Sequence, residues 1–332
     1  MPRTTSIALA IAVSATALVE AGPTTVSIVH GEWRLNGRVT YPGTAAEGLL
    51  MNVRMVNAVF EDANDGTRPA GFDPDANTSA FIKKIHEYVA QGIRAFTINL
   101  QGGDPKYEGA VNSAFTTDGS LRDSYLARVR RVIQAADRRG AVVILGCFYQ
   151  RQDQTLENDD AVRAAVINVA RWLRDSGFRN VVVEIANEFG HKGFDHTLLR
   201  TAEGQVELIG LAKQVAPRLL VSTSGLGNGR IPDDVAAAAD FLLPHFNNTQ
   251  LEEIPARAQV LRAHEKPVVC NEDDKIGELG ARAAEAAVAG GISWGFMDKE
   301  TNQHHPFRFN GAQDDPLVYA ALKRLTTRPR PR

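Results

Sequence analysis

Short apolar runs alternate with amphipathic stretches from residue 49 to the end of the chain. The apolar runs are rich in β-branched residues and predict strands over 49–60, 95–101, 141–149, 180–187, 219–224, 241–246, 267–271 and 292–297. Between and after them, apolar residues recur at helical spacing, which predicts helices over 78–91, 121–139, 159–176, 201–216, 232–239, 251–264, 277–289 and 316–325. Ser120 is a candidate helix cap, and Gly140 and Gly177 are candidate helix ends.

This alternation has the period of a (β/α)8 barrel, in which each parallel strand is followed by a helix. A doubly wound sheet is the alternative, but it usually has fewer strands and carries a glycine-rich phosphate turn after the first one. The sequence contains no such turn. We therefore expect an α/β fold, a (β/α)8 TIM barrel, with residues 49–327 forming one domain.

The residues outside the barrel divide into three parts. Residues 1–21 have a short basic start, an apolar run and small residues, which is typical of a secretory signal peptide and predicts a secreted or periplasmic protein. A buried N-terminal helix is the alternative. The Asn36-Gly37 pair is a strong turn signal, so residues 22–48 are expected to form a β-hairpin that plugs the barrel floor. Residues 328–332 alternate Arg and Pro and predict a disordered tail.

Composition narrows the class of protein. The chain is 44% hydrophobic and 23% charged, as in ordinary globular proteins, and no segment after the leader could span a membrane. A formal net charge of −2 argues against a dedicated nucleic-acid binder. Cys147 and Cys270 are too few for a disulfide scaffold and are expected to be buried free thiols, although a bridge between them stays open. The oligomeric state is not predicted.

Polar residues gather at the carboxyl ends of the predicted strands, where barrel enzymes carry their active sites. Glu188 and Glu272 end strands four and seven, so their carboxylates can face each other across the mouth of the ring. Such a pair can cleave a glycosidic bond, because one group protonates the leaving oxygen while the other attacks the anomeric carbon. Glu272 is favoured over Asp273 and Asp274 because it is in phase with the strand end and reaches further.

A family resemblance supports this interpretation. Asn187-Glu188, following the apolar run 181–186, resembles the Asn-Glu motif that ends strand four in clan A glycoside hydrolases, in particular the cellulase-like family 5 group. The resemblance implies that Glu188 is the acid/base and Glu272 the nucleophile. It also implies that Arg54, Asn187, His245 and Trp294 bind the sugar, with Trp294 as the sugar platform. Asn99, Tyr149, Asn247 and Glu300 are further candidates for the sugar site because they lie at or after the ends of predicted strands. The chain departs from the family at Asn247, where a Tyr is usual, and at Phe189, where a Pro is usual.

We therefore expect a retaining glycoside hydrolase that acts on β-linked oligosaccharides, polysaccharides or glycosides without a cofactor. Glu184, two strand steps below Glu188, is expected to point into the barrel and pair with Arg54. One alternative is a barrel that binds carbohydrate without turnover. A weaker alternative is a metal-dependent hydrolase that uses His191, His196 or His304, whose spacing matches no zinc motif.

Overall fold

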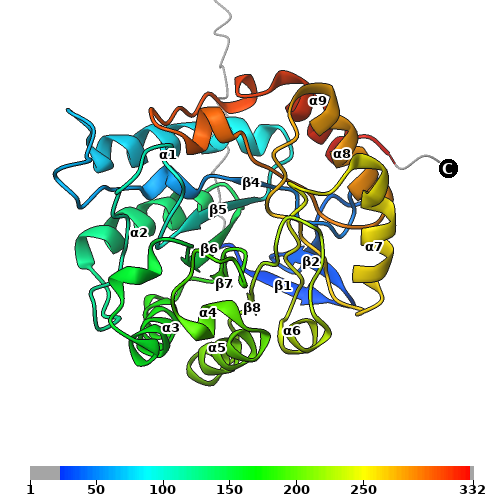
Figure 1. The fold of residues 1–332 in the computed structure, drawn as a ribbon. Helices are drawn as coiled ribbons and strands as arrows, with labels where there is room; N and C mark the ends of the chain where they lie inside the picture. Colours follow the sequence, from blue (N-terminus) through cyan, green and yellow to red (C-terminus); the bar gives the residue numbers. More distant parts are fainter. Residues whose placement is uncertain (1–22, 330–332) are drawn as a thin grey trace, which may run out of the picture.

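The predicted strands form a closed ring in the computed structural model, which describes residues 23–329 (Figure 1). A parallel sheet has the order β8-β7-β6-β5-β4-β9. Its strands are β4 (Asn52–Arg54), β5 (Ala95–Asn99), β6 (Val142–Phe148), β7 (Val181–Ala186), β8 (Val221–Ser222) and β9 (Gly295–Phe296). Single parallel bridges at Ser224↔Leu243, Leu242↔Val268 and Val269↔Ser293 close the ring through the predicted strands six and seven. The fold is a (β/α)8 TIM barrel, and this prediction is confirmed.

The first predicted strand is much shorter than expected. After β4 the chain turns into a 3-10 helix, η1 (Val56–Val59), whose side chains are all buried. A continuous apolar run fits a buried strand and a buried turn equally well, so its length gave the wrong boundary.

Helices surround the ring (Figure 1). They are α1 (Pro74–Ala90), α2 (Asp123–Asp137), α3 (Asp159–Ser176), α4 (Thr197–Arg200), α5 (Ala202–Val215), α6 (Asp233–Ala238), α7 (Ile254–Arg262), α8 (Gly277–Ala289) and α9 (Pro316–Thr327). Short 3-10 turns η2 (Asp153–Thr155), η3 (Leu251–Glu253) and η5 (Gly311–Gln313) and a π-helical turn η4 (Lys299–Gln303) lie in the connecting loops.

Helix ends follow local capping chemistry. Asp73 accepts hydrogen bonds from two backbone amides of α1 and precedes Pro74, so this helix begins four residues earlier than predicted. Gly177 ends α3 in the left-handed conformation, as expected. The prediction that Ser120 caps a helix is wrong, because its hydroxyl donates to Asp118 within a loop turn and α2 begins only at Asp123.

The segment before the barrel forms three strands rather than a two-stranded hairpin. β1 (Val26–Val29), β2 (Glu32–Leu35) and β3 (Arg38–Val39) pair in that order in an antiparallel sheet. Both connections are two-residue turns with positive φ at each position, at His30-Gly31 and at Asn36-Gly37. The first turn was missed because His is a much weaker turn signal than Asn at a position that needs positive φ.

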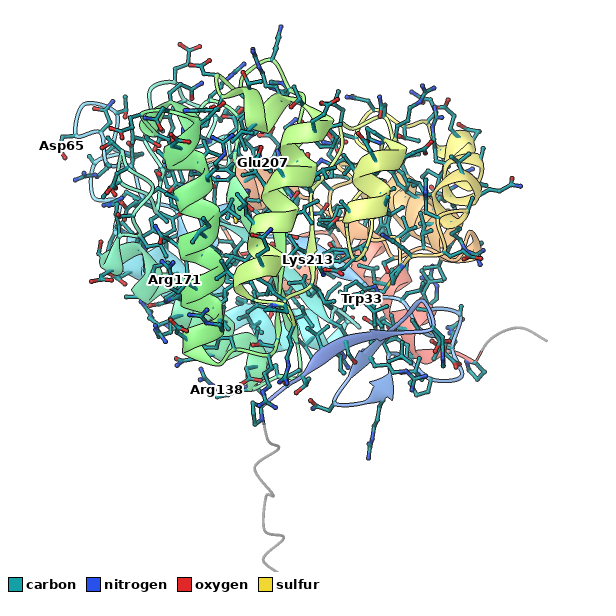
Figure 2. All side chains as sticks on the ribbon, turned by 90° about the horizontal axis from the view of Figure 1, so that it is seen from below. Trp33, Asp65, Arg138, Arg171, Glu207 and Lys213 are labelled. Carbon is teal, nitrogen blue, oxygen red and sulfur yellow. The ribbon has the colours of Figure 1, made fainter. Side chains whose placement is uncertain are left out.

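This small sheet covers the barrel floor, as expected (Figure 2). The Trp33 side chain is fully buried and meets Phe241 edge to face, with ring centroids 5.2 Å apart. It belongs to a separate apolar cluster made by the first inward residues of the strands: Leu50, Ala95, Val142, Ile144, Val182, Phe241, Leu243 and Val269. The lower barrel is therefore a packed core, which leaves the opposite end for chemistry.

The predictions for the two ends of the chain have different outcomes. The signal-peptide prediction for residues 1–21 lies outside the described residues. The tail prediction is wrong at its first positions, because Pro329 forms a bridge with Thr44; residues 330–332 lie outside the description. Within residues 23–329, Cys147 and Cys270 are buried and free, and no helix is long and apolar enough to cross a bilayer.

Candidate active site

Most of the predicted site residues meet at the upper end of the barrel. Strands alternate inward and outward side chains, and above the apolar floor the inward positions become polar. They converge from β4, the ends of β6 and β7, and the predicted strands six and seven. The residues brought together are Arg54, Tyr149, Asn187, Glu188, His245, Asn247 and Glu272.

Glu272 is held by positive and polar groups on two sides. Its Oε2 lies 2.6 Å from Nε of Arg54, and both side chains are almost fully buried. The Asn247 amide donates a short hydrogen bond to Oε1. These contacts favour the ionised carboxylate and fix its orientation.

A bulge in the seventh predicted strand (267–271), which is a different strand from β7, points Glu272 at the site. Leu242 pairs with Val268, but His245 pairs with Glu272, so strand seven has one residue more than strand six over the same length. Strict alternation from the inward-facing Val269 would turn Glu272 outward. Because of the extra residue, the side chains of Asn271 and Glu272 both point into the barrel. Asn271 contacts Glu184 there, and Glu272 contacts Arg54. The sequence argument chose the residue that faces the site, but the reason is this bulge rather than simple phase.

Glu188 occupies a strained turn directly after β7. Its φ is 52°, which is a left-handed conformation that L side chains rarely adopt. Ser224 clamps this turn: its hydroxyl accepts from the Glu188 amide at 2.9 Å, and its carbonyl accepts from the Phe189 amide at 3.0 Å. Strain held by surrounding contacts is common where a functional side chain must be aimed. The Glu188 side chain remains 15% exposed, so it reaches the solvent side of the mouth.

The two glutamates share His245. Nδ1 of this ring lies 3.5 Å from Oε1 of Glu188 and 3.6 Å from Oε2 of Glu272. One carboxylate oxygen of each glutamate and one ring nitrogen all lie within 4.8 Å of one another. The two carboxylates are therefore close enough to act on neighbouring atoms of one ligand.

A second polar layer supports the first from below. Glu184, fully buried, lies 3.8 Å from Nη1 of Arg54 and 3.8 Å from Nε2 of His245. It also accepts a hydrogen bond from the Asn271 amide at 3.2 Å. The predicted pairing of Glu184 with Arg54 is confirmed, and the carboxylate holds both cationic groups from the barrel side.

The charges shift the pKa values in consistent directions. Burial alone would raise the pKa of Glu272, but Arg54 and His245 outweigh it and the net shift is downward. Burial opposes the charge of Arg54 and His245, yet the carboxylates around them, chiefly Glu272, raise the pKa of both. The interactions around Glu272 therefore favour its ionised form and the protonated forms of Arg54 and His245.

Asn187 and Tyr149 complete the rim of the site. The Asn187 carbonyl accepts from Nη2 of Arg54, and its amide donates to Oε1 of Gln150 at 3.0 Å. Burial and the charge of Glu272 raise the pKa of Tyr149, so its hydroxyl keeps its proton. Ser224 was not among the predicted site residues; it ends the predicted strand 219–224, which was the available signal.

Three predicted site residues lie elsewhere. Trp294 cannot be a sugar platform in this structure, because it is fully buried on the outward side of its strand and donates to Asp273 at 2.8 Å. Asn99 is also fully buried, below the mouth, and neither amide atom has a partner among the described residues. Glu300 lies on the exposed rim, where it pairs with Lys106 at 2.7 Å.

The histidines of the metal-dependent alternative do not form one site. His196 contacts Asp153, His304 contacts Glu300, and His191 accepts from the Gly193 amide. Within residues 23–329, the one group with suitable ligand spacing is Glu188, His245 and Glu272. The Arg54 guanidinium already neutralises Glu272 at 2.6 Å, so this group does not fit a divalent cation well.

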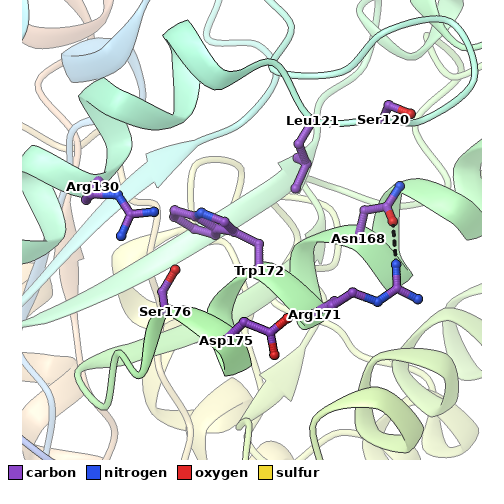
Figure 3. Close-up of a pocket in the computed structure, with 8 residues that line it drawn as sticks. All are labelled: Ser120, Leu121, Arg130, Asn168, Arg171, Trp172, Asp175 and Ser176. Carbon is purple, nitrogen blue, oxygen red and sulfur yellow. Dashed lines mark hydrogen bonds between the residues drawn. The ribbon is translucent and has the colours of Figure 1, made fainter.

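A separate hollow of about 550 Å³ lies on the outer wall of the barrel between α2 and α3 (Figure 3). Its lining includes Arg130, Asn168, Arg171 and Trp172, with the Arg130 guanidinium 5.6 Å from the centroid of the Trp172 ring. It contains no pair of facing carboxylates and shares no residue with the candidate active site.

Glycoside hydrolases are among the solved structures with a similar fold, whereas no protein-family model and no curated protein matches the sequence. A glycoside hydrolase candidate from Bacteroides vulgatus aligns with a TM-score of 0.65 at 13% identity, over 91% of this chain and 60% of that one. A broad-specificity family 5 endoglucanase from Clostridium longisporum aligns with a TM-score of 0.58 at 12% identity, over 87% and 98% of the two chains.

A third neighbour is a family 5 xyloglucanase from Bacteroides ovatus, solved with a XXXG heptasaccharide. It aligns with a TM-score of 0.55 at 12% identity, over 82% of this chain and 74% of that one. At such identities the shared property is the fold. The chain therefore resembles the cellulase-like clan A glycoside hydrolases and shares their (β/α)8 barrel.

Proposed function

We propose that this protein is a retaining glycoside hydrolase that cleaves β-glycosidic bonds, with Glu272 as nucleophile and Glu188 as acid/base. The observation that carries the proposal is the pair of facing carboxylates, of which one oxygen from each lies within 4.8 Å of the other. Retaining enzymes hold these groups about 5–5.5 Å apart, whereas inverting enzymes leave a wider gap for a water molecule. The folds of the neighbours support a carbohydrate substrate.

The two glutamates differ in the way that double displacement requires. Arg54 and Asn247 hold Glu272 ionised and fixed, as a nucleophile must be. Glu188 has no guanidinium contact and lies on the more open side of the mouth, where it protonates the leaving oxygen. Water then attacks the glycosyl-enzyme ester, and Glu188 takes the proton of that water. The products are a free sugar of retained configuration and the regenerated carboxylates.

We extend the proposal to sugar binding, domain organisation and export. Asn187 and Tyr149 are placed to bind sugar hydroxyls, and residues 49–327 act as a single catalytic domain. The leader pattern of residues 1–21 supports export to the periplasm or the medium.

Covalent labelling tests the assignment. A panel of aryl 2-deoxy-2-fluoro-β-glycosides should add one glycosyl group to Glu272, detected by peptide mass, because the fluorine slows breakdown of the ester. Glu272→Gln should form no adduct. Glu188→Ala should lower kcat by about 10²–10⁴-fold, and azide should restore turnover by giving a β-glycosyl azide.

Glu207→Gln, on the outer face of α5 (Figure 2), is the matched control and should behave as the wild type. A labelled residue other than Glu272, or wild-type turnover by either active-site variant, would contradict the assignment. Binding of sugars across the panel without any adduct would favour a barrel that only binds carbohydrate.

A further inference from the structure

We propose that the mouth of the barrel is closed on the side that holds the retained sugar, so that the enzyme removes short units from a chain end. This inference rests on the proposed function and specifies its substrate: a glycan or glycoside with a free non-reducing end. Two loops meet over the end of β4. They are the segment 101–109 after β5 and the segment 298–309 after β9.

The loop after β5 packs closely against residues that follow both neighbouring strands. Gly102 and Gly103 both have positive φ, at 87° and 83°. A Cβ added to Gly102 would lie 2.0 Å from the Tyr149 side chain, and one added to Gly103 would lie 1.7 Å from Oδ1 of Asn57. The backbone therefore lies directly against Tyr149 after β6 and against Asn57 after β4.

The loop after β9 meets this first loop from the other side. The His305 amide donates to the Pro105 carbonyl at 3.0 Å, and Lys106 pairs with Glu300 at 2.7 Å. Below this junction, the buried Asn57 amide donates to the Gln303 carbonyl at 2.6 Å. The exposed ion pair is worth little by itself. The backbone and buried hydrogen bonds hold the two loops together more firmly.

An aromatic cluster packs against the junction and stiffens it. His305 contacts Tyr107, Phe72 and Phe307 edge to face, with ring centroids 5.4–6.3 Å apart. Phe307 in turn packs on the buried Phe60. These rings connect both loops to the segment after β4, so the loops cannot separate without exposing apolar surface.

The positions of the two carboxylates indicate which side of the barrel mouth is closed. The general acid stands beside the leaving oxygen, so the leaving group lies on the β7 and β8 side and the retained sugar lies away from it, over β4, β5 and β9. That second side is the one covered by the joined loops. On the leaving-group side, the glycine-rich loop after β8 exposes Leu226, and a second sugar or an aglycone can extend outward there.

Paired substrates test this geometry. The probes are nitrophenyl β-glycosides of glucose, mannose and galactose and of their β-linked disaccharides, each compared with a benzylidene derivative blocked at the non-reducing end. The expected result is hydrolysis of at least one unblocked probe and no detectable hydrolysis of its blocked partner. On polysaccharides, we expect release of small sugars without an early fall in viscosity.

A loop variant adds an independent check. His305→Ala removes the ring that packs edge to face against Tyr107, Phe72 and Phe307, and so loosens the junction of the two loops. It should make hydrolysis of the blocked probes detectable relative to that of the unblocked probes. His264→Ala, directly after α7 and before the predicted strand 267–271, is the matched control and should leave this ratio unchanged.

Equal hydrolysis of blocked and unblocked probes, or a rapid fall in viscosity, would overturn the closed side while leaving the hydrolase proposal intact. An unchanged ratio in His305→Ala would show that the joined loops do not exclude the blocked probes and would also overturn it. Absence of any turnover and of any fluoro-sugar adduct would remove the hydrolase proposal, and this inference with it.

Discussion

His245 is a fully buried histidine whose charge state depends on its neighbours. Three carboxylates, Glu184, Glu188 and Glu272, surround it within 3.8 Å, and the Arg54 guanidinium contacts two of them. One guanidinium cannot neutralise both Glu184 and Glu272, even when Glu188 carries the proton that its proposed role as acid requires. A proton on the imidazole therefore lowers the repulsion inside the barrel, although burial opposes it.

We expect the pKa of His245 to exceed its ordinary value of 6.5 and to fall when Glu272 is neutralised. Because the folded-state pKa is raised, protonation stabilises the fold fully below about pH 6.5, and this stabilisation is lost as the pH rises through the raised pKa. Imidazole NMR titrations of the wild type and of Glu272→Gln measure the shift, with the signal assigned by its absence in His245→Asn. The same titration curve in both proteins would contradict the coupling.

At the scale of elements, the alternation of strand residues explains one wrong prediction. Ile292, Trp294 and Phe296 face outward into the helix-packed core, while Ser293 and Gly295 face inward. The sequence contained this signal, since three apolar residues at every second position indicate the buried outer face. Family resemblance placed Trp294 in the site against that pattern.

The bulge in strand seven could not be predicted in the same way. It appears only when the register of strand seven is compared with that of strand six, and both are short pairings formed across a ring. The strands, the helices and the turn at Asn36-Gly37 depend on local patterns, so the sequence predicted them well. The orientation of Glu272, the Ser224 clamp and the joined loops depend on contacts between distant segments, which local patterns do not determine.

The N-terminal sheet should contribute strongly to stability through one side chain. Trp33→Ala would leave a cavity at the barrel floor and should lower the free energy of unfolding by about 3–5 kcal/mol. Trp33→Phe is the matched control and should cost less, because the indole nitrogen has no hydrogen-bond partner to lose. Denaturant melts measure both values. A loss below about 1 kcal/mol for Trp33→Ala would show that the sheet is dispensable for stability.

At the scale of the whole molecule, contacts between the two ends of the chain complete the ring. β4 pairs with β9, the Ala46 amide donates to the Leu325 carbonyl, and Thr44 bridges Pro329. β4, the first strand of the ring, pairs with both β5 and β9, so it cannot leave without opening pairings on both sides of it. The barrel is therefore expected to unfold as one cooperative unit.

The two buried thiols test this cooperativity from opposite sides of the ring. Cys147 lies in β6 and Cys270 in strand seven; both are fully buried, and burial raises the pKa of each thiol, so neither should react with a disulfide reagent in the native protein. With rising denaturant, both should become reactive at the same rate, because one global opening exposes them. Cys147→Ala and Cys270→Ala each report the remaining thiol. If one thiol reacts in conditions that leave the other protected, the halves of the barrel open independently and the single-domain interpretation is wrong.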